Sequence, residues 1–407
     1  MNGPRVMIVS HHFAPSSATG AIRSTRLARF LAGVGLPPVV VTAAKAFYGA
    51  EVHQDSHLRE ELDVFEVPLG RYVRRLESLG GTGRRLAIPA LVLAYARGIE
   101  RALRKRPDVD LLYFCGHPFW YFPLARHFLL RLGLPYVLDF EDVFYMRGIP
   151  YRLGRRAGLR EHFDRQAEAW AVAGAAVVLH TTELQSRIYK ERYKWKAAWR
   201  FLTVRWGYDE DALASLRPAA ESGDGPFRIA IFGKLASYSR QDAQALASAV
   251  AAIPEGRPIQ VDHLGAPEPE LEDAFRRQGL GACFRTCGMQ PYREGLRNLV
   301  SADCLVLNAI SEVSIPAKTY DYIAVNRPIV AFVTPRSAAG RLLCRFSGAF
   351  LVQTAKQAER ALRTIIQRDV VELSPGPDPT QFSQQYQFQK LLAALRALMQ
   401  GRSVPCG

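Results

Sequence analysis

One segment of the C-terminal half combines residue types that suit a nucleotide. A strand pattern ends near Leu307, and Pro316 is predicted in the first turn of a helix, where its missing N–H sacrifices no hydrogen bond. N–H groups at such a helix start attract a diphosphate. Lys318 adds a positive charge, and Asp321, on the same helix face, can accept hydrogen bonds from ribose hydroxyls. The segment predicts a nucleotide site; the alternative is an amphipathic helix with a surface Lys–Asp pair.

A second cationic position follows the first strand pattern of the same half. Gly233 and Lys234 come directly after the apolar run 229–232, so that the glycine leaves space and the lysine supplies charge for a phosphate. Arg240 is a further candidate a few residues on. A Gly-Lys pair is common, and the prediction therefore depends on the segment around Lys318.

The loop after the first strand pattern of the chain is long and built from small residues. It opens a predicted helix, whose N–H groups attract anions, and Gly20 allows a ligand or backbone to come close. Ser17, Thr19 and Gly20 are therefore predicted to form a loop that binds a phosphate or another part of a ligand. The loop lacks the G-x-G-x-x-G pattern of dinucleotide sites, and an ordinary βα loop is the alternative.

His117 and Asp142 each follow another strand pattern of the N-terminal half. In parallel sheets, ligands bind beyond the carboxyl ends of the strands. His117 can hydrogen-bond a substrate hydroxyl or exchange a proton near neutral pH, and we predict that it is catalytic rather than a turn histidine held by its neighbours. Asp142 is the second predicted catalytic residue. It and Asp139 either face the ligand or cap the segment that follows.

The elements that must position these residues alternate between strands and helices. Strand patterns occupy 6–10, 39–42, 111–114, 136–139 and 176–179, then 228–232, 259–264, 283–286, 304–307 and 329–333. Helical patterns lie between them, which predicts an α/β fold with two doubly wound, Rossmann-like domains. A Gly-, Pro- and Ser-rich break separates the halves. The predicted parts are an N-terminal domain at 1–210, a linker at 211–225, a C-terminal domain at 226–380, and a helix and tail at 381–407.

Composition narrows the classes of function. The chain has 407 residues and a net charge of +15, of which residues 1–205 contribute +13. Such a bias suits an anionic membrane face or an anionic substrate, and without a recognition motif we expect no nucleic-acid partner. Cys283 and Cys287 lack a second Cys/His pair with finger-like spacing, so no metal site is predicted.

The opening residues carry no signal-peptide pattern, and no run of about 18 apolar residues occurs. We therefore expect a cytoplasmic protein, with peripheral contact at the inner membrane face.

Together these segments resemble family 4 retaining glycosyltransferases and their relatives with the GT-B fold. The resemblance is carried by Pro15, Gly20 and Arg23 with 39–42, by 135–142, by 181–184 with 206–209, and by 315–322 with 327–329. It covers nearly the whole chain. It implies two Rossmann-like domains facing across a cleft, with the C-terminal helix returning to the N-terminal domain.

The resemblance also implies an activity. A hexosyl or related group would pass from a nucleotide-diphosphate sugar, UDP favoured, to a hydroxyl of a glycan, lipid-linked or small-molecule acceptor, with retention. No metal and no cofactor beyond the nucleotide-sugar co-substrate is implied. The C-terminal domain would bind the donor, with Lys234 and Arg240 at the diphosphate, Lys318 assisting and Asp321 at the ribose. His117 would contact the reacting sugar in the N-terminal domain.

Two departures from the family pattern leave alternatives. The family often has two glutamates separated by seven residues, whereas Glu312, the predicted sugar contact, and Asp321 are separated by eight. An inverting enzyme with Asp139, Asp142 or His12 as general base is one alternative. A catalytically silent GT-B protein that binds a nucleotide or a protein partner is the other.

Overall fold

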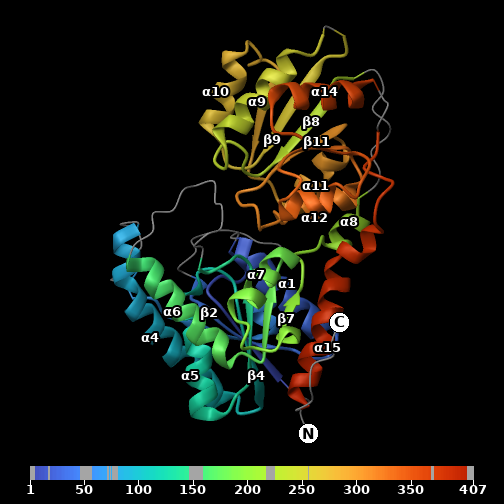
Figure 1. Ribbon diagram of the computed structural model, residues 1–407. Coiled ribbons are helices and arrows are strands. Elements are labelled where there is room, and N and C mark those ends of the chain that lie inside the picture. The colour runs from blue at the N-terminus through green and yellow to red at the C-terminus, as the bar shows by residue number, and fades with distance from the viewer. Residues whose placement is uncertain are drawn as a thin grey trace. The chain divides into compact units, whose positions relative to one another are not determined.

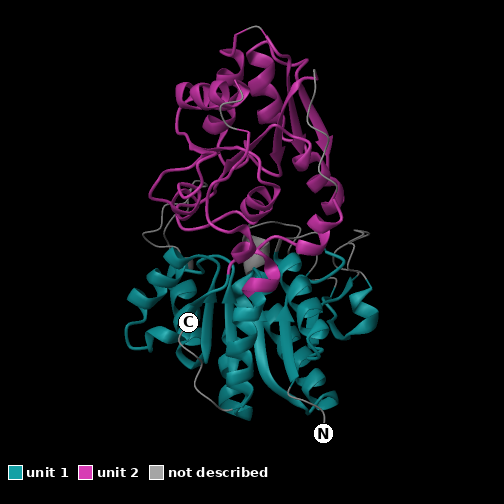
Figure 2. Cartoon of the chain, turned by 90° about the vertical axis from the view of Figure 1, so that its right-hand side faces the viewer, with its two compact units in different colours: residues 1–147, 157–204, 388–407 teal, residues 148–156, 205–387 magenta. Residues whose placement is uncertain are grey.

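The computed structural model describes residues 5–16, 19–45, 57–70, 73, 75, 81–145, 159–216, 225–254, 256–367 and 371–400. The chain forms two compact units (Figure 2). Unit 1 comprises Met1–Arg147, Ala157–Val204 and Phe388–Gly407, and unit 2 comprises Gly148–Arg156 and Arg205–Gln387. The division after Val204 lies a few residues before the Gly- and Pro-rich break.

Unit 1 contains a seven-stranded sheet in the order β3-β2-β1-β4-β5-β6-β7. The strands are β1 Arg5–Ser10, β2 Val39–Ala43, β3 Asp63–Val67, β4 Val109–Cys115, β5 Tyr136–Phe140, β6 Val177–His180 and β7 Phe201–Thr203. All neighbours pair in parallel, with Met7 opposite Val39 and Leu112. The inner strands are apolar on both faces because helices cover both sides of the sheet.

The helices of unit 1 are α1 Thr19–Gly33, α2 Leu58–Glu61, α4 Gly81–Lys105, α5 Pro123–Leu132, α6 Leu159–Gly174 and α7 Glu183–Arg192. Helices α4, α5 and α6 lie together on one side of the sheet (Figure 1). The last helix, α15 Gln384–Met399, places Phe388, Leu391 and Leu395 in the same core as Ile8 and Leu27. The prediction that the C-terminal helix returns to the N-terminal domain is therefore confirmed.

Unit 2 contains a six-stranded parallel sheet in the order β10-β9-β8-β11-β12-β13. The strands are β8 Phe227–Phe232, β9 Ile259–Leu264, β10 Phe284–Gly288, β11 Cys304–Asn308, β12 Ile329–Phe332 and β13 Ala349–Leu351. The helices are α8 Glu210–Ala214, α9 Arg240–Ala251, α10 Pro269–Arg277, α11 Tyr292–Val300, α12 Lys318–Val325, α13 Ala338–Leu343 and α14 Ala355–Ile366. Helix α9 packs against α10 and α14, and α11 packs against α12.

The predicted fold class, two doubly wound α/β domains, is confirmed. One local prediction is wrong: Pro316 does not lie in the first turn of the helix that contains Lys318 and Asp321. Helix α12 begins at Lys318 with Ala317 as its N-cap, and the Pro316 carbonyl accepts a hydrogen bond from the Thr319 N–H in the preceding turn. Within the described residues, no helix is long and apolar enough to cross a membrane.

Candidate functional site

In unit 2, the chain leaves β8 through a tight turn that depends on two glycines. Gly233 has a φ of 74°, a conformation that side chains other than glycine rarely adopt. Its N–H donates to the Leu264 carbonyl over 2.7 Å. A Cβ on Gly265 would lie only 3.1 Å from the Gly233 Cα. The backbones of the β8 and β9 loops therefore touch at the carboxyl edge of the sheet, where ligands of parallel sheets bind.

Lys318 connects helix α12 to this turn. Its Nζ donates to the Phe232 carbonyl over 2.7 Å and to the Lys234 carbonyl over 3.2 Å. Burial lowers the pKa of Lys318 to about 8, although Glu268 nearby raises it in part. Lys318 therefore holds the Gly233–Lys234 turn, and these two carbonyls occupy two of its three N–H donors.

Glu268 occupies the backbone N–H groups that follow this turn. Its carboxylate accepts from the N–H groups of Leu235 at 2.8 Å, Ala236 at 3.0 Å and Ser237 at 2.8 Å. Burial opposes ionisation of Glu268, but the hydrogen bonds from Ser237 and from the three backbone N–H groups outweigh it and lower the pKa. Three N–H groups that would otherwise suit a phosphate are thus bound to the protein's own carboxylate.

Asp321 is buried near the start of α12 and accepts a hydrogen bond from the Tyr292 hydroxyl of α11 over 2.6 Å. Tyr322, one residue on, donates to the Val306 carbonyl and accepts from the Phe232 N–H, which fixes α12 against β11 and β8. The structure therefore brings the predicted residues Gly233, Lys318 and Asp321 to one part of unit 2, and it adds Tyr292, which the sequence did not single out.

The other predicted donor residues lie around this group. Lys234 is exposed next to Gly233. Glu312 accepts a hydrogen bond from the Thr334 hydroxyl over 2.7 Å, and Arg240 pairs with Glu270 on the surface over 2.7 Å. Their donor-binding roles stay predictions.

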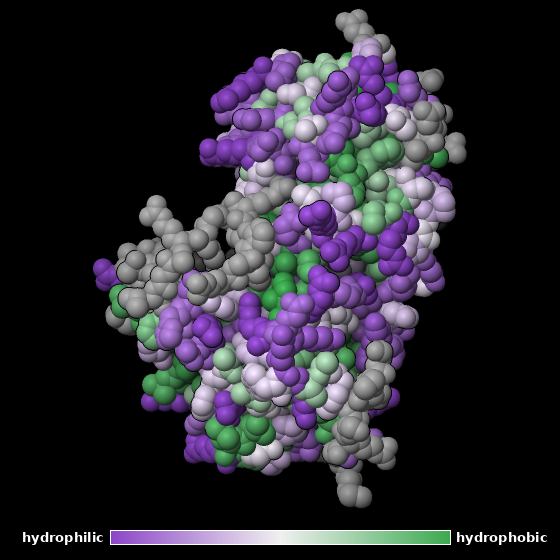
Figure 3. Space-filling model, in the orientation of Figure 1, coloured by the Kyte–Doolittle hydropathy of each residue, from purple (hydrophilic) through white to green (hydrophobic). Residues whose placement is uncertain are grey.

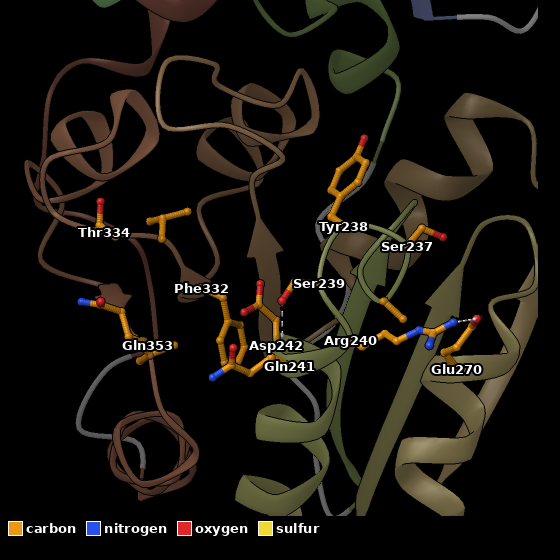
Figure 4. Close-up of a pocket in the computed structure, with 13 residues that line it drawn as sticks. Ser237, Tyr238, Ser239, Arg240, Gln241, Asp242, Glu270, Phe332, Thr334 and Gln353 are labelled. Atoms are coloured by element: carbon orange, nitrogen blue, oxygen red, sulfur yellow. Dashed lines mark hydrogen bonds and ion pairs between the residues drawn. The ribbon is translucent and has the colours of Figure 1, made fainter. Parts of the chain in front are cut away.

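A polar pocket lies at the carboxyl ends of β8, β12 and β13 (Figure 4). Its volume is about 830 Å³, and it is lined by residues 236–242, Glu270, 332–334, Val352 and Gln353. Thr334 lines the pocket and also donates a hydrogen bond to Glu312, so that Glu312 lies next to the pocket. Of the predicted donor residues, Arg240 alone is among those that line this pocket.

In unit 1, the Asp139 carboxylate is fully engaged by its neighbours. Arg23 donates two hydrogen bonds to it, at 2.8 and 3.1 Å, and the Tyr113 hydroxyl donates a third at 2.6 Å. The Arg23 and Asp139 side chains are each 1% exposed. Asp139 is therefore a structural anion, which removes it from the alternative in which it acts as a general base.

Glu141, two residues further on, is buried beside this pair but differs from it. The His117 N–H donates to its carboxylate, and within the described part of the chain Oε1 has no partner. Burial raises the pKa of Glu141 to about 8, and Asp139 and Asp142 raise it further against the effect of Arg23. The sequence gives no reason to prefer Glu141, because three carboxylates stand within four positions.

The predicted catalytic residues of unit 1 lie at the same edge of its sheet. His117 and Asp142 are both exposed, and the His117 ring centroid lies 5.3 Å from that of Phe119. Gly20 lies in the first turn of α1, against Glu141 and the His117 N–H. Thr19 begins α1, and Ser17 lies outside the described residues. Catalytic roles for His117 and Asp142 stay predictions.

No protein-family model matches the chain, and no curated protein matches its sequence. Solved structures share its fold over almost its whole length. A glycosyltransferase from Rickettsia africae ESF-5 superposes with a TM-score of 0.68 at 13% identity, over 98% of this chain and 99% of that one. HepE from Anabaena, in complex with UDP and glucose, gives 0.64 at 13% identity, over 97% and 99%.

The UDP-GlcNAc 2-epimerase from Methanocaldococcus jannaschii gives a TM-score of 0.59 at 10% identity, over 97% of this chain and 99% of that one. Likeness at such identities shows the fold alone. The chain therefore has the fold of these proteins, with two Rossmann-like units of seven and six parallel strands.

Proposed function

We propose that this protein is a glycosyltransferase that moves a hexosyl or related sugar from a nucleotide-diphosphate sugar, UDP favoured, to an acceptor hydroxyl. The observation that carries the proposal is the convergence of Gly233, Lys318 and Asp321 at the carboxyl edge of unit 2. The sequence resemblance to family 4 enzymes and the fold shared with HepE, whose structure contains UDP and glucose, both support it.

The proposed donor site assigns one role to each group. Asp321, held by Tyr292, accepts the hydroxyls of the ribose. The remaining N–H of Lys318 and the exposed amine of Lys234 bind the diphosphate. Glu312, oriented by Thr334, binds a hydroxyl of the transferred sugar.

The proposed reaction proceeds with retention and without a metal. The bond between the anomeric carbon and the diphosphate oxygen breaks, and its electron pair leaves with the nucleotide. The acceptor oxygen attacks from the same face, and its proton passes to the departing phosphate. Lys318 and Lys234 stabilise the negative charge that develops on the diphosphate.

The proposed acceptor is a glycan, a lipid-linked glycan or a small molecule bound by unit 1, and an anionic membrane face is the proposed peripheral partner at the inner side. Large apolar side chains on α4, α5 and α6 are exposed, among them Leu86, Leu93, Leu130 and Phe163. Figure 3 shows hydrophobic surface between polar atoms where Figure 1 places these helices. The described side chains of helices α4 and α5 include six basic ones and one acidic one. Apolar groups among cations suit an anionic lipid surface.

The donor site is tested by thermal unfolding with UDP, GDP, ADP and TDP, alone and as their sugars. We expect one nucleotide to stabilise the wild type, and Asp321→Asn to lose most of that shift because the ribose contact weakens. Lys356→Gln, an exposed lysine on α14, is the matched control and keeps the shift. If no nucleotide stabilises the protein, the transferase proposal fails.

The membrane partner is tested by sedimentation with phosphatidylglycerol vesicles at low and high salt. We expect binding that salt reverses and that Leu86→Ser with Leu130→Ser weakens about tenfold, since each leucine contributes apolar burial. Val371→Ser, at an exposed apolar position of unit 2, is the control and should bind like the wild type. A protein that stays in the supernatant at low salt would exclude this partner.

Two other functions would give different products when the protein is incubated with a nucleotide sugar, with and without an acceptor. The shared fold with a UDP-GlcNAc 2-epimerase makes isomerisation of the donor sugar a candidate, which would yield an epimer without free UDP. Glu268 and Lys318 both make hydrogen bonds to the protein's own backbone, which favours a catalytically silent nucleotide-binding protein. Such a protein would bind UDP without converting any substrate. Release of UDP that depends on an added acceptor supports transfer against both.

A further inference from the structure

The carboxyl edge of unit 1 contains a buried acid group that its surroundings leave incomplete. Glu141 is 7% exposed, and its Oε1 has no hydrogen-bond partner among the described residues. Its backbone is held, because the Thr181 hydroxyl donates to the Glu141 carbonyl over 2.9 Å. An unpaired carboxyl oxygen in such a place carries a free-energy cost that a ligand can remove.

Two glycines keep side chains away from this carboxyl. A Cβ on Gly20 would lie 3.4 Å from Oε2 and 3.8 Å from Oε1, and a Cβ on Gly116 would lie 3.9 Å from Oε1. Gly20 belongs to the first turn of α1, and Gly116 follows β4 with a φ of 83°. The start of α1 and the turn after β4 therefore meet at Glu141, which follows β5.

The charges around Glu141 decide what kind of group fits. Arg23 of α1 is neutralised by Asp139 of β5 through two hydrogen bonds. Asp142 adds a negative charge on the following loop, and the buried Cys115 thiol of β4, whose pKa burial raises, is neutral. With Arg23 paired to Asp139, these groups leave no surplus positive charge beside Glu141, even when Glu141 is protonated. A phosphate is therefore disfavoured here, whereas a neutral hydroxyl can both donate to a carboxyl oxygen and accept from it.

We infer that Glu141 binds a hydroxyl group of a neutral, sugar-like acceptor in unit 1, with Gly20 and Gly116 leaving the space for it. This inference rests on the proposed transferase function and names the chemistry of its acceptor side. It also assigns Gly20 to the acceptor and not to a phosphate. Glu141 is a binding residue in this arrangement, and no bond is made or broken on it.

The experiment uses the full chain and ligand-observed NMR with glucose, galactose, N-acetylglucosamine, myo-inositol and glycerol, with inorganic phosphate as the anionic competitor. We expect at least one hydroxyl compound to bind the wild type. Gly20→Ala should weaken that binding at least tenfold, because its methyl group would lie against both Glu141 oxygens. Glu141→Leu should weaken it to a similar extent, because it removes the polar group altogether.

Gly33→Ala is the matched control, because it lies in the same helix with no atom within 4 Å of the added methyl group. It should bind like the wild type. Gly20→Ala suits helical geometry, so that its loss of binding would not reflect unfolding, and the melting temperature checks this. The inference is overturned if no hydroxyl compound binds the wild type, if both variants bind like it, or if phosphate displaces the sugar.

Failure of this inference and failure of the proposed function give different results. UDP stabilisation, which reports on unit 2, should be the same in the wild type, Gly20→Ala and Glu141→Leu. Loss of every nucleotide shift would defeat the transferase proposal, while the sugar titrations would still decide whether Glu141 binds a hydroxyl.

Discussion

In unit 2, Glu268 accepts hydrogen bonds from three consecutive N–H groups. In unit 1, Glu141 is equally buried and accepts a bond from the His117 N–H, but its Oε1 has no partner among the residues that the structure describes. The same kind of side chain thus has opposite consequences at the carboxyl edges of two similar sheets. The hydrogen bonds lower the pKa of Glu268 despite its burial, and burial raises the pKa of Glu141 to about 8. The Glu268 carboxylate stabilises the loop at 235–237, whereas Glu141 keeps an oxygen that can accept a hydrogen bond from a ligand.

The largest expected effect concerns Asp139, the satisfied carboxylate next to Glu141. Asp139→Ala leaves the Arg23 guanidinium buried without its anion. Breaking a buried pair in this way lowers the free energy of unfolding by about 3–5 kcal/mol. Urea unfolding at pH 7 measures the change. A loss below about 1 kcal/mol, typical of a surface pair, would contradict the view that this pair anchors the edge of the sheet.

Glu141 should behave in the opposite sense. Its pKa is raised from 4.5 to about 8, so the folded protein must hold a proton that the unfolded chain releases, and stability falls as the pH rises through this window. Glu141→Gln removes the ionisation. We expect it to be roughly 2–4 kcal/mol more stable than the wild type at pH 9 and about equal to it at pH 4.

Urea unfolding at the two pH values checks this prediction. Equal stability of Glu141→Gln and wild type at pH 9 would mean that Glu141 has a partner and is not the unsatisfied member of the comparison.

The sequence was sufficient for the architecture because the inner strands are continuous apolar runs, as in 6–10 and 304–307. It was insufficient at the sheet edges, where β3, β7 and β13 are short and partly exposed and therefore lack a clear hydrophobic pattern. The second half of the predicted nucleotide segment, Lys318 and Asp321, is brought into one part of unit 2, but the helix begins only at Lys318 and leaves out Pro316, which was predicted to lie in its first turn.

The partners of individual side chains could not be predicted. Arg23 and Asp139 are 116 positions apart, and nothing in the local pattern says that Arg23 takes Asp139 and leaves Glu141. Likewise, Lys318 donates to the carbonyls of Phe232 and Lys234, which lie 86 and 84 positions earlier in the chain.

Glu268→Gln should have a smaller effect, because the amide keeps one acceptor oxygen for the loop. We expect a loss of about 1–3 kcal/mol at pH 7, since an N–H group of the loop at 235–237 loses its partner. The pKa of Glu268 is lowered in the folded state, so its contribution is present above 4.5 and is lost as the pH falls through the folded pKa below that value. The difference between variant and wild type should therefore shrink at pH 3 in urea titrations.

The smallest expected change in stability is at Arg240, and it sharpens the comparison by separating structure from binding. The Arg240 and Glu270 side chains are 73% and 45% exposed, and such surface pairs contribute about 0–1 kcal/mol. Arg240→Gln should therefore unfold like the wild type in urea. If Arg240 binds the diphosphate, the same variant loses affinity for UDP roughly tenfold, equivalent to about 1.4 kcal/mol. Unchanged UDP affinity, measured by calorimetry beside Lys356→Gln, would restrict the diphosphate contacts to Lys234 and Lys318.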